Sequence, residues 1–174
     1  MTTLLTERLK LRPFRASDAP ALAAAHMDAE TMRYFGYGVA ASEAEAMERA
    51  ETRIADYGEH WAERGYGTWA LEDRADASFV GRCGLRYIDE LGETELLYLI
   101  VRPRWRQGLA SEASARALAF GFETCGLDEI VALAMPENIG SRRVMEKAGM
   151  RYADELRLWD IDLVRYRLRR DEFR

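Results

Sequence analysis

The stretch from residue 94 to residue 119 constrains the fold more than any other part of the chain. Residues 95–101 are almost all apolar, which is typical of a strand that is buried on both faces. Pro103 ends this strand, and from Leu109 the chain is rich in helix-forming residues, without Gly or Pro until Gly121. The pattern therefore predicts a strand, a tight turn and a helix in direct succession.

The turn between this strand and this helix has the properties of an anion-binding site. Gly108 can adopt a backbone conformation that side chains forbid, and the first N–H groups of a helix have no partners within the helix. These donors and the positive end of the helix dipole suit a ligand that bears phosphate. Three arginines stand nearby: Arg102, Arg104 and Arg106. The alternative is a solvated turn that binds nothing, as at most joints of this kind.

Composition places the chain among ordinary globular proteins. Its 174 residues are 48% hydrophobic and 32% charged, so we expect a single domain over residues 1–174. The net charge of −5 argues against a broad nucleic-acid-binding face. We see no apolar run of membrane-spanning length and no signal-peptide pattern. Cys83 and Cys125 lack CxxC spacing, which indicates a cytoplasmic location without disulfides or a metal site.

The remaining patterns predict an α+β fold with a mostly antiparallel sheet and helices on both faces. A turn over residues 89–92 makes the strand before it antiparallel to the central strand. The expected strands cover residues 5–14, 68–71, 78–87, 94–101, 130–135, 150–159 and 162–168, and the expected helices residues 17–27, 28–34, 42–62, 109–120 and 139–148.

A second stretch, residues 136–152, has the pattern of a capped helix that leads into a strand. Asn138 is placed to cap this helix, and Ser141 lies in its first turn. In this order, the two stretches resemble the GNAT family of acyl-CoA-dependent N-acetyltransferases. The similarity is greatest to the branch that includes the ribosomal-protein N-terminal acetyltransferases, which opens like residues 6–12 and closes like residues 162–168. The resemblance covers nearly the whole chain and implies a mixed sheet of roughly seven strands, with a splay between the two central strands.

The resemblance also implies that acetyl-CoA is the cosubstrate. Its pyrophosphate would lie on backbone amides from Arg106 through Ser111, and its pantetheine arm would lie beside the central strand. The residues expected to bind it are Leu99, Ile100, Val101, Arg106, Gln107, Gly108, Leu109, Ala110, Ser111, Asn138 and Ser141.

The chain departs from the family pattern at three positions. Trp105 occupies the first position of the phosphate motif, which removes one side-chain contact but leaves the backbone cradle. Leu97 stands where this branch usually has glycine. Met145 stands where many relatives carry a catalytic tyrosine, and because methionine cannot transfer a proton, that role belongs to another group or to none.

The implied reaction is direct attack of a primary amine, from a protein N-terminus or a small molecule, on the thioester in a ternary complex. Ser141 is the group expected near the thioester sulfur, with a purely structural first-turn serine as the alternative. Glu95 is a candidate base or water relay, with an exposed edge carboxylate as the alternative. Because direct transfer needs no covalent acyl-enzyme, Cys83 and Cys125 are expected to pack in the fold.

Two classes of function stay open at this point. The first is an acetyl-CoA-dependent N-acetyltransferase, and the second is a non-catalytic acyl-CoA-binding or regulatory module, which Met145 keeps open. The expected partner is an amine-bearing substrate, without nucleic acid or membrane, and the C-terminal strands could supply a homodimer interface. Four aromatic residues lie in the region that forms the acceptor site of relatives, and we expect at least half of them to pack in the core: Tyr34, Phe35, Tyr37 and Trp61.

Overall fold

The computed structural model describes residues 1–174 and contains one eight-stranded sheet in the order β1-β2-β3-β4-β5-β6-β8-β7. All neighbouring strands are antiparallel except β5 and β6, so the predicted mixed, mostly antiparallel fold is confirmed. The strands are β1 (Leu4–Leu5), β2 (Leu9–Arg12), β3 (Thr68–Asp73), β4 (Phe79–Ile88), β5 (Glu93–Ile100), β6 (Glu129–Ala134), β7 (Arg151–Leu158) and β8 (Ile161–Arg169). The α-helices are α1 (Ala19–Met27), α2 (Ala29–Met32), α3 (Glu43–Arg64), α4 (Leu109–Ala119) and α5 (Ile139–Lys147).

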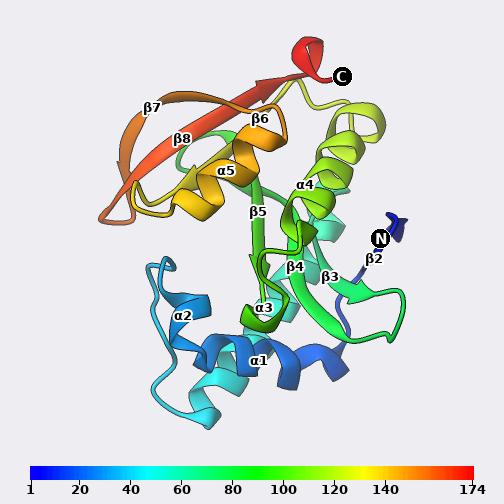
Figure 1. Ribbon diagram of the computed structural model, residues 1–174, viewed down its shortest axis with the longest axis vertical. Coiled ribbons are helices and arrows are strands. Elements are labelled where there is room, and N and C mark those ends of the chain that lie inside the picture. Colours follow the sequence, from blue (N-terminus) through cyan, green and yellow to red (C-terminus); the bar gives the residue numbers. More distant parts are fainter.

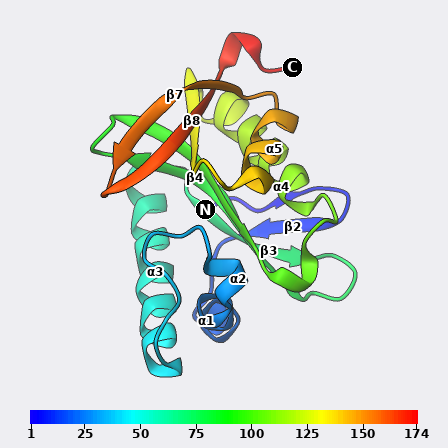
Figure 2. The ribbon, with the colours of Figure 1, turned by 60° about the vertical axis from the view of Figure 1, so that its left-hand side comes forward.

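Helices cover both faces of the sheet, as expected. Figures 1 and 2 show α4 and α5 on one side of the central strands and α1, α2 and α3 on the other. The largest hydrophobic core lies between α4 and the sheet and includes Trp69, Leu85, Leu118 and Ile130, all fully buried. Truncation of a buried leucine such as Leu118 to alanine costs about 2–5 kcal/mol. None of the helices combines the length and the apolar character that crossing a membrane requires.

The ends of α3 show how local sequence defines the helices. Ser42 Oγ accepts a hydrogen bond from Glu45 N at 3.2 Å, and Glu45 Oε2 accepts one from Ala41 N at 2.8 Å. The first bond satisfies a donor of the first helical turn, and the second holds the residue before the cap. Gly65 ends the helix with φ +74°, a left-handed conformation that favours glycine.

The N-terminal strand is shorter than expected because the chain turns back at Thr6. Thr6 N donates to Leu9 O, and Thr6 Oγ1 accepts from Leu9 N, both at 2.9 Å. This tight turn divides the expected strand over residues 5–14 into β1 and β2, which pair with each other. The division accounts for an eighth strand where roughly seven were expected.

The predicted splay lies between β5 and β6. Their only register pair is Glu95 with Val131, and β5 continues to Ile100 without a partner on that side. Val101 N donates to Val80 O on β4, so the backbone groups of Val101 and of every second residue before it point toward β4. The backbone groups of the residues between them point away from β4, toward β6. The backbone groups of Tyr98 and Ile100 therefore face the gap.

Candidate active site

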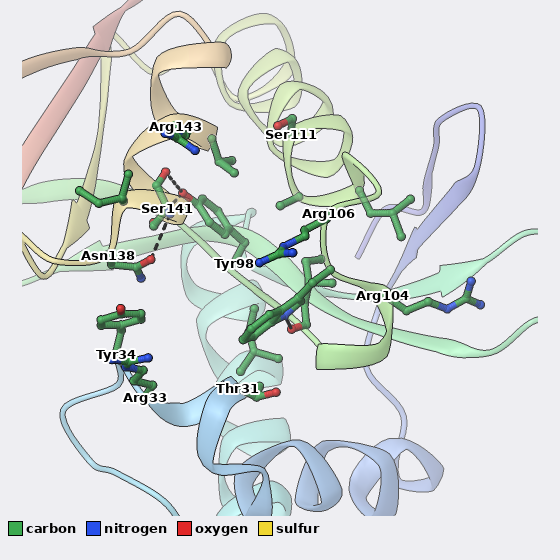
Figure 3. Close-up of a pocket in the computed structure, with 18 of the residues that line it drawn as sticks. Thr31, Arg33, Tyr34, Tyr98, Arg104, Arg106, Ser111, Asn138, Ser141 and Arg143 are labelled. Atoms are coloured by element: carbon green, nitrogen blue, oxygen red, sulfur yellow. Dashed lines mark hydrogen bonds between the residues drawn. The ribbon is translucent and has the colours of Figure 1, made fainter.

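The gap beside β5 opens into a cleft of about 700 Å³. Its walls come from the end of β5, the turn before α4, the start of α5 and the segment around α2 (Figure 3). Two of the residues expected to bind acetyl-CoA, Val101 and Gln107, lie outside these walls. The others line the cleft: Leu99, Ile100, Arg106, Gly108, Leu109, Ala110, Ser111, Asn138 and Ser141.

The turn before α4 presents unused backbone donors. Gly108 precedes the helix with φ +77° and ψ 3°, and Arg106 also has a left-handed backbone with φ +61°. The first helical bond runs from Glu112 N to Gly108 O. The N–H groups of residues 106–111 donate no hydrogen bond within the protein. They remain available to an anion at the positive end of α4.

Arg8 holds this turn in place from the N-terminal part of the chain. Its Nη1 donates to Gln107 O at 2.7 Å, and its Nε donates to Glu112 Oε2 at 2.7 Å. The carbonyl and the N–H of a trans peptide point in opposite directions. The bond to Gln107 O therefore directs the N–H of Gly108 away from Arg8. Arg8 could not be anticipated from local sequence patterns, because 99 residues separate it from its partner.

The cations around the cleft differ in part from those expected. Arg102 and Arg104 form ion pairs with aspartates, and Figure 3 shows the side chain of Arg104 directed away from that of Arg106. Arg106 forms no ion pair and lines the cleft. Arg143 and Lys147 of α5 line it as well, again without ion pairs. These two residues were missed, although their spacing of four places them on one helix face.

Ser141 forms a hydroxyl pair with Tyr98. Asn138 Oδ1 accepts from Ser141 N at 3.1 Å, so Asn138 caps α5 as predicted. Ser141 Oγ lies 2.8 Å from Tyr98 Oη, which also donates to Ser141 O at 2.9 Å (Figure 3). Burial raises the pKa of Tyr98, so its hydroxyl is protonated at neutral pH.

Tyr98 supplies a phenolic hydroxyl at the cleft, which the last helix does not. Met145, at the position where many relatives carry a tyrosine, is 1% exposed and packs in the core. Sequence patterns alone did not assign a catalytic role to Tyr98. The available signal was a single polar aromatic among the aliphatic residues at positions 96–100.

Glu95 lies in a smaller cavity of about 100 Å³ that shares Tyr98 and Ser141 with the main cleft. The residue is 6% exposed, so the alternative of an exposed edge carboxylate is wrong. Glu95 Oε2 accepts from Arg86 Nη2 at 2.6 Å. Burial raises the pKa of Glu95, and the positive charge of Arg86 opposes this effect only in part.

Two of the four aromatic residues of this region pack against core clusters, Trp61 and Phe35, which is the half that was expected. Trp61 packs in the core, with its ring centroid 5.1 Å from that of Trp69. Tyr34 and Phe35 line both cavities. Tyr37 lies against the arginines of the α3 side.

The family model described as the acetyltransferase (GNAT) domain matches residues 8–151. The chain belongs to the GNAT family of acetyltransferases. This GNAT acetyltransferase is 31% identical to the protein YkkB of Bacillus subtilis (strain 168), with 95% of this chain and 94% of YkkB covered. It is 30% identical to the N-acetyltransferase YoaA of the same organism, with 88% and 85% covered. The structure matches the ribosomal-protein-S5-alanine acetyltransferase from Vibrio fischeri with a TM-score of 0.80 at 16% identity, with both chains fully covered.

Acetyl-CoA is the cosubstrate of the GNAT family, and the cleft has groups that complement it. The free N–H groups of residues 106–111 suit a pyrophosphate. Arg106, Arg143 and Lys147 are unpaired cations on the walls. The open edge of β5 offers backbone hydrogen bonds to an extended chain that contains amides.

Proposed function

We propose that this GNAT acetyltransferase acetylates a primary amine, on a protein N-terminus or a small molecule, by direct attack in a ternary complex. The observation that carries the proposal is the row of unpartnered N–H groups at the start of α4, beside the open edge of β5. Acetyl-CoA supplies an activated acetyl group when it is bound. The chain has to hold it, orient the amine and move protons.

Backbone groups supply most of the proposed contacts to acetyl-CoA. The N–H groups of residues 106–111 bind the pyrophosphate, and Arg106 and Arg143 complement the phosphate charge. Trp105 Nε1 donates to Ile100 O at 2.6 Å, so this carbonyl is already engaged. The backbone groups of Tyr98 and the N–H of Ile100 stay free for the pantetheine arm.

The site has a candidate base for the attacking amine and candidate proton donors for the leaving sulfur. An ammonium group has no lone pair, so the acceptor must lose a proton before attack. Glu95 is the proposed base, because a raised pKa brings a carboxylate closer to the pH at which it works. The hydroxyls of Ser141 and Tyr98 are the proposed donors to the leaving sulfur. Glu95, Tyr98 and Ser141 line the same small cavity, so one reacting centre is within reach of all three.

The cysteines do not favour a covalent route. Cys83 is buried, and burial raises the pKa of its thiol to about 12. A thiol with this pKa carries almost no thiolate at neutral pH and is a poor nucleophile. Direct transfer gains its rate from the positioning of two bound substrates.

Release of free CoA thiol from acetyl-CoA, measured against a panel of peptide N-termini and small-molecule amines, tests the proposal. We expect turnover with at least one amine, intersecting initial-rate plots and no acetylated enzyme by mass spectrometry. Parallel plots together with an acetyl-enzyme would contradict direct attack. Binding of acetyl-CoA without turnover on any amine would favour a non-catalytic module.

Loss of the hydroxyl pair should lower turnover more than binding. We expect Tyr98→Phe and Ser141→Ala each to lower kcat about 10- to 100-fold, with less than about a threefold change in the KM for acetyl-CoA. The double variant should have about the same kcat as the less active of the two single variants, because the two hydroxyls act as one unit. Tyr152→Phe, which removes the hydroxyl of an exposed tyrosine, is the matched control. An unchanged kcat in both single variants would remove the pair from the mechanism.

A further inference from the structure

Arg82 of β4 is a buried cation without an anionic partner. The residue is 8% exposed and lies on the sheet face that α3 covers. Its Nη2 donates one long hydrogen bond, 3.4 Å to Tyr37 Oη, and its Nε is buried without a partner. Buried charges in proteins are normally paired, because an unpaired charge loses its hydration without compensation. This guanidinium therefore has an unused capacity to bind an anion.

The surroundings of Arg82 carry excess positive charge. The guanidinium carbons of Arg49 and Arg53 lie 5.2 and 5.5 Å from the centroid of the Tyr37 ring. Burial first, and then these arginines with Arg82, lower the pKa of His26 to about 4. The carboxylates nearby are each bonded to another arginine: Glu45 to Arg49, Asp56 to Arg53 and Glu95 to Arg86. None of these carboxylates forms an ion pair with Arg82, and Glu95 attracts it only from beyond ion-pair distance.

Arg82 is connected to the reacting centre through its neighbours in the sheet. It is the cross-strand partner of Leu99, which lines the cleft. Phe35, whose ring centroid is 5.6 Å from the Arg82 guanidinium, lines both cavities. Glu95 lies on the same face four residues before Leu99, about 13 Å along β5. Arg82 itself lines neither cavity, so a small molecule bound beside Glu95 reaches it only by displacing the side chains that cover it.

The segment that covers Arg82 is a loop that contains no helix or strand. Residues 33–42 connect α2 to α3 and contain two glycines, and Gly38 has φ +63°. Tyr37 in this segment is 38% exposed, and its hydroxyl takes the place that an anionic oxygen would have beside Arg82. The Tyr37 hydroxyl is a neutral acceptor, whereas a carboxylate adds its own negative charge and can accept two parallel bonds from the guanidinium. Such a ligand can displace the hydroxyl.

We propose that the acceptor is an amine that also carries a carboxylate, and that Arg82 binds this carboxylate in place of the Tyr37 hydroxyl. The planar fork of a guanidinium matches a carboxylate with two parallel hydrogen bonds. The amine then lies on the side of Glu95. This inference rests on the proposed acetyl transfer and adds the chemical class of the acceptor.

Turnover with matched amines tests the inference. Straight-chain ω-amino acids of increasing length are compared with their primary amides, with release of CoA thiol as the readout. For the best length, we expect kcat/KM for the acid to exceed that for the amide about tenfold or more, mainly through KM. Acids and amides acetylated equally well would overturn the inference and leave the acetyl transfer intact. Absence of turnover with every amine would overturn both.

Variants of Arg82 test whether this residue causes the preference for the acid over the amide. Arg82→Gln should bring the ratio of acid to amide close to one while the affinity for acetyl-CoA, measured by calorimetry, stays the same. Arg151→Gln, which removes an exposed arginine, should keep the ratio of the unmodified protein. A preserved ratio in Arg82→Gln would overturn the assignment.

A second variant keeps the test decisive if Arg82→Gln does not fold. Tyr37→Phe removes the competing hydroxyl and leaves the guanidinium intact. We expect it to lower the KM for the acid about two- to threefold without change for the amide. An unchanged or higher KM for the acid would contradict the displacement of the Tyr37 hydroxyl.

Discussion

Replacement of Gly108 by valine is expected to weaken acetyl-CoA binding about 100-fold, or about 2.8 kcal/mol. The backbone at Gly108 has φ +77°, where a residue with a Cβ is strained by about 1–2 kcal/mol and a β-branched one by more. A Cβ at this position would approach only Arg8 Nη2, at 3.5 Å, so the effect comes from the backbone and not from a clash. If the backbone of the variant relaxes to a different φ, the peptide groups of the turn rotate. Their N–H groups then no longer point together into the cleft. Calorimetric titration with acetyl-CoA measures the effect.

Gly65 is a matched control for this experiment. It ends α3 with φ +74° and ψ 3°, almost the same backbone conformation as Gly108, and a Cβ there would meet nothing within 4 Å. Gly65→Val should therefore show a similar loss of thermal stability with unchanged affinity for acetyl-CoA. Equal affinities for acetyl-CoA in the two variants would show that the turn before α4 does not hold the cosubstrate.

Glu95→Gln is expected to lower kcat/KM for the amine about 100- to 10,000-fold, the range of a lost general base. Gln keeps the shape of the side chain and can still accept a hydrogen bond from Arg86, so the fold should persist. The affinity for acetyl-CoA should be unchanged. Steady-state rates with saturating acetyl-CoA measure the effect.

The pH dependence separates a base from a structural carboxylate. Glu95 must be ionised to accept a proton, and its pKa is raised above 4.5 by burial. The activity of the unmodified protein should therefore fall as the pH decreases through this raised pKa, and Glu95→Gln should lack this decline. The deficit of the variant should shrink at high pH, where the amine loses its proton in solution.

Glu93→Gln is the control for Glu95→Gln on the same strand. Glu93 is also ion-paired, to Arg165 at 2.8 Å, but it lines neither cavity. We expect this variant to keep the activity and the pH profile of the unmodified protein. The same decline at low pH in Glu95→Gln as in the unmodified protein would assign the titration to another group.

Much of the fold follows from patterns that extend over a few residues. The apolar run before Pro103, the glycine at position 108 and the helix-forming residues after it predict β5, the turn and α4. The boundaries of α5 follow from Asn138 and Gly149 in the same way. The first strand was the exception, because the Thr6 turn that divides it is also held by Glu112 of α4, far along the chain.

Apart from the first strand, the sequence by itself determined the order of strands, helices and caps, and where a turn could present free backbone donors, because these depend on residues within about four positions of one another. The tertiary structure decided which side chains meet at the site. It brought Tyr98 to Ser141 across 43 residues, buried Glu95 beside Arg86 and left Arg82 without an anion. Burial and charge pairing depend on contacts between distant segments, and those contacts exist only after the sheet has assembled.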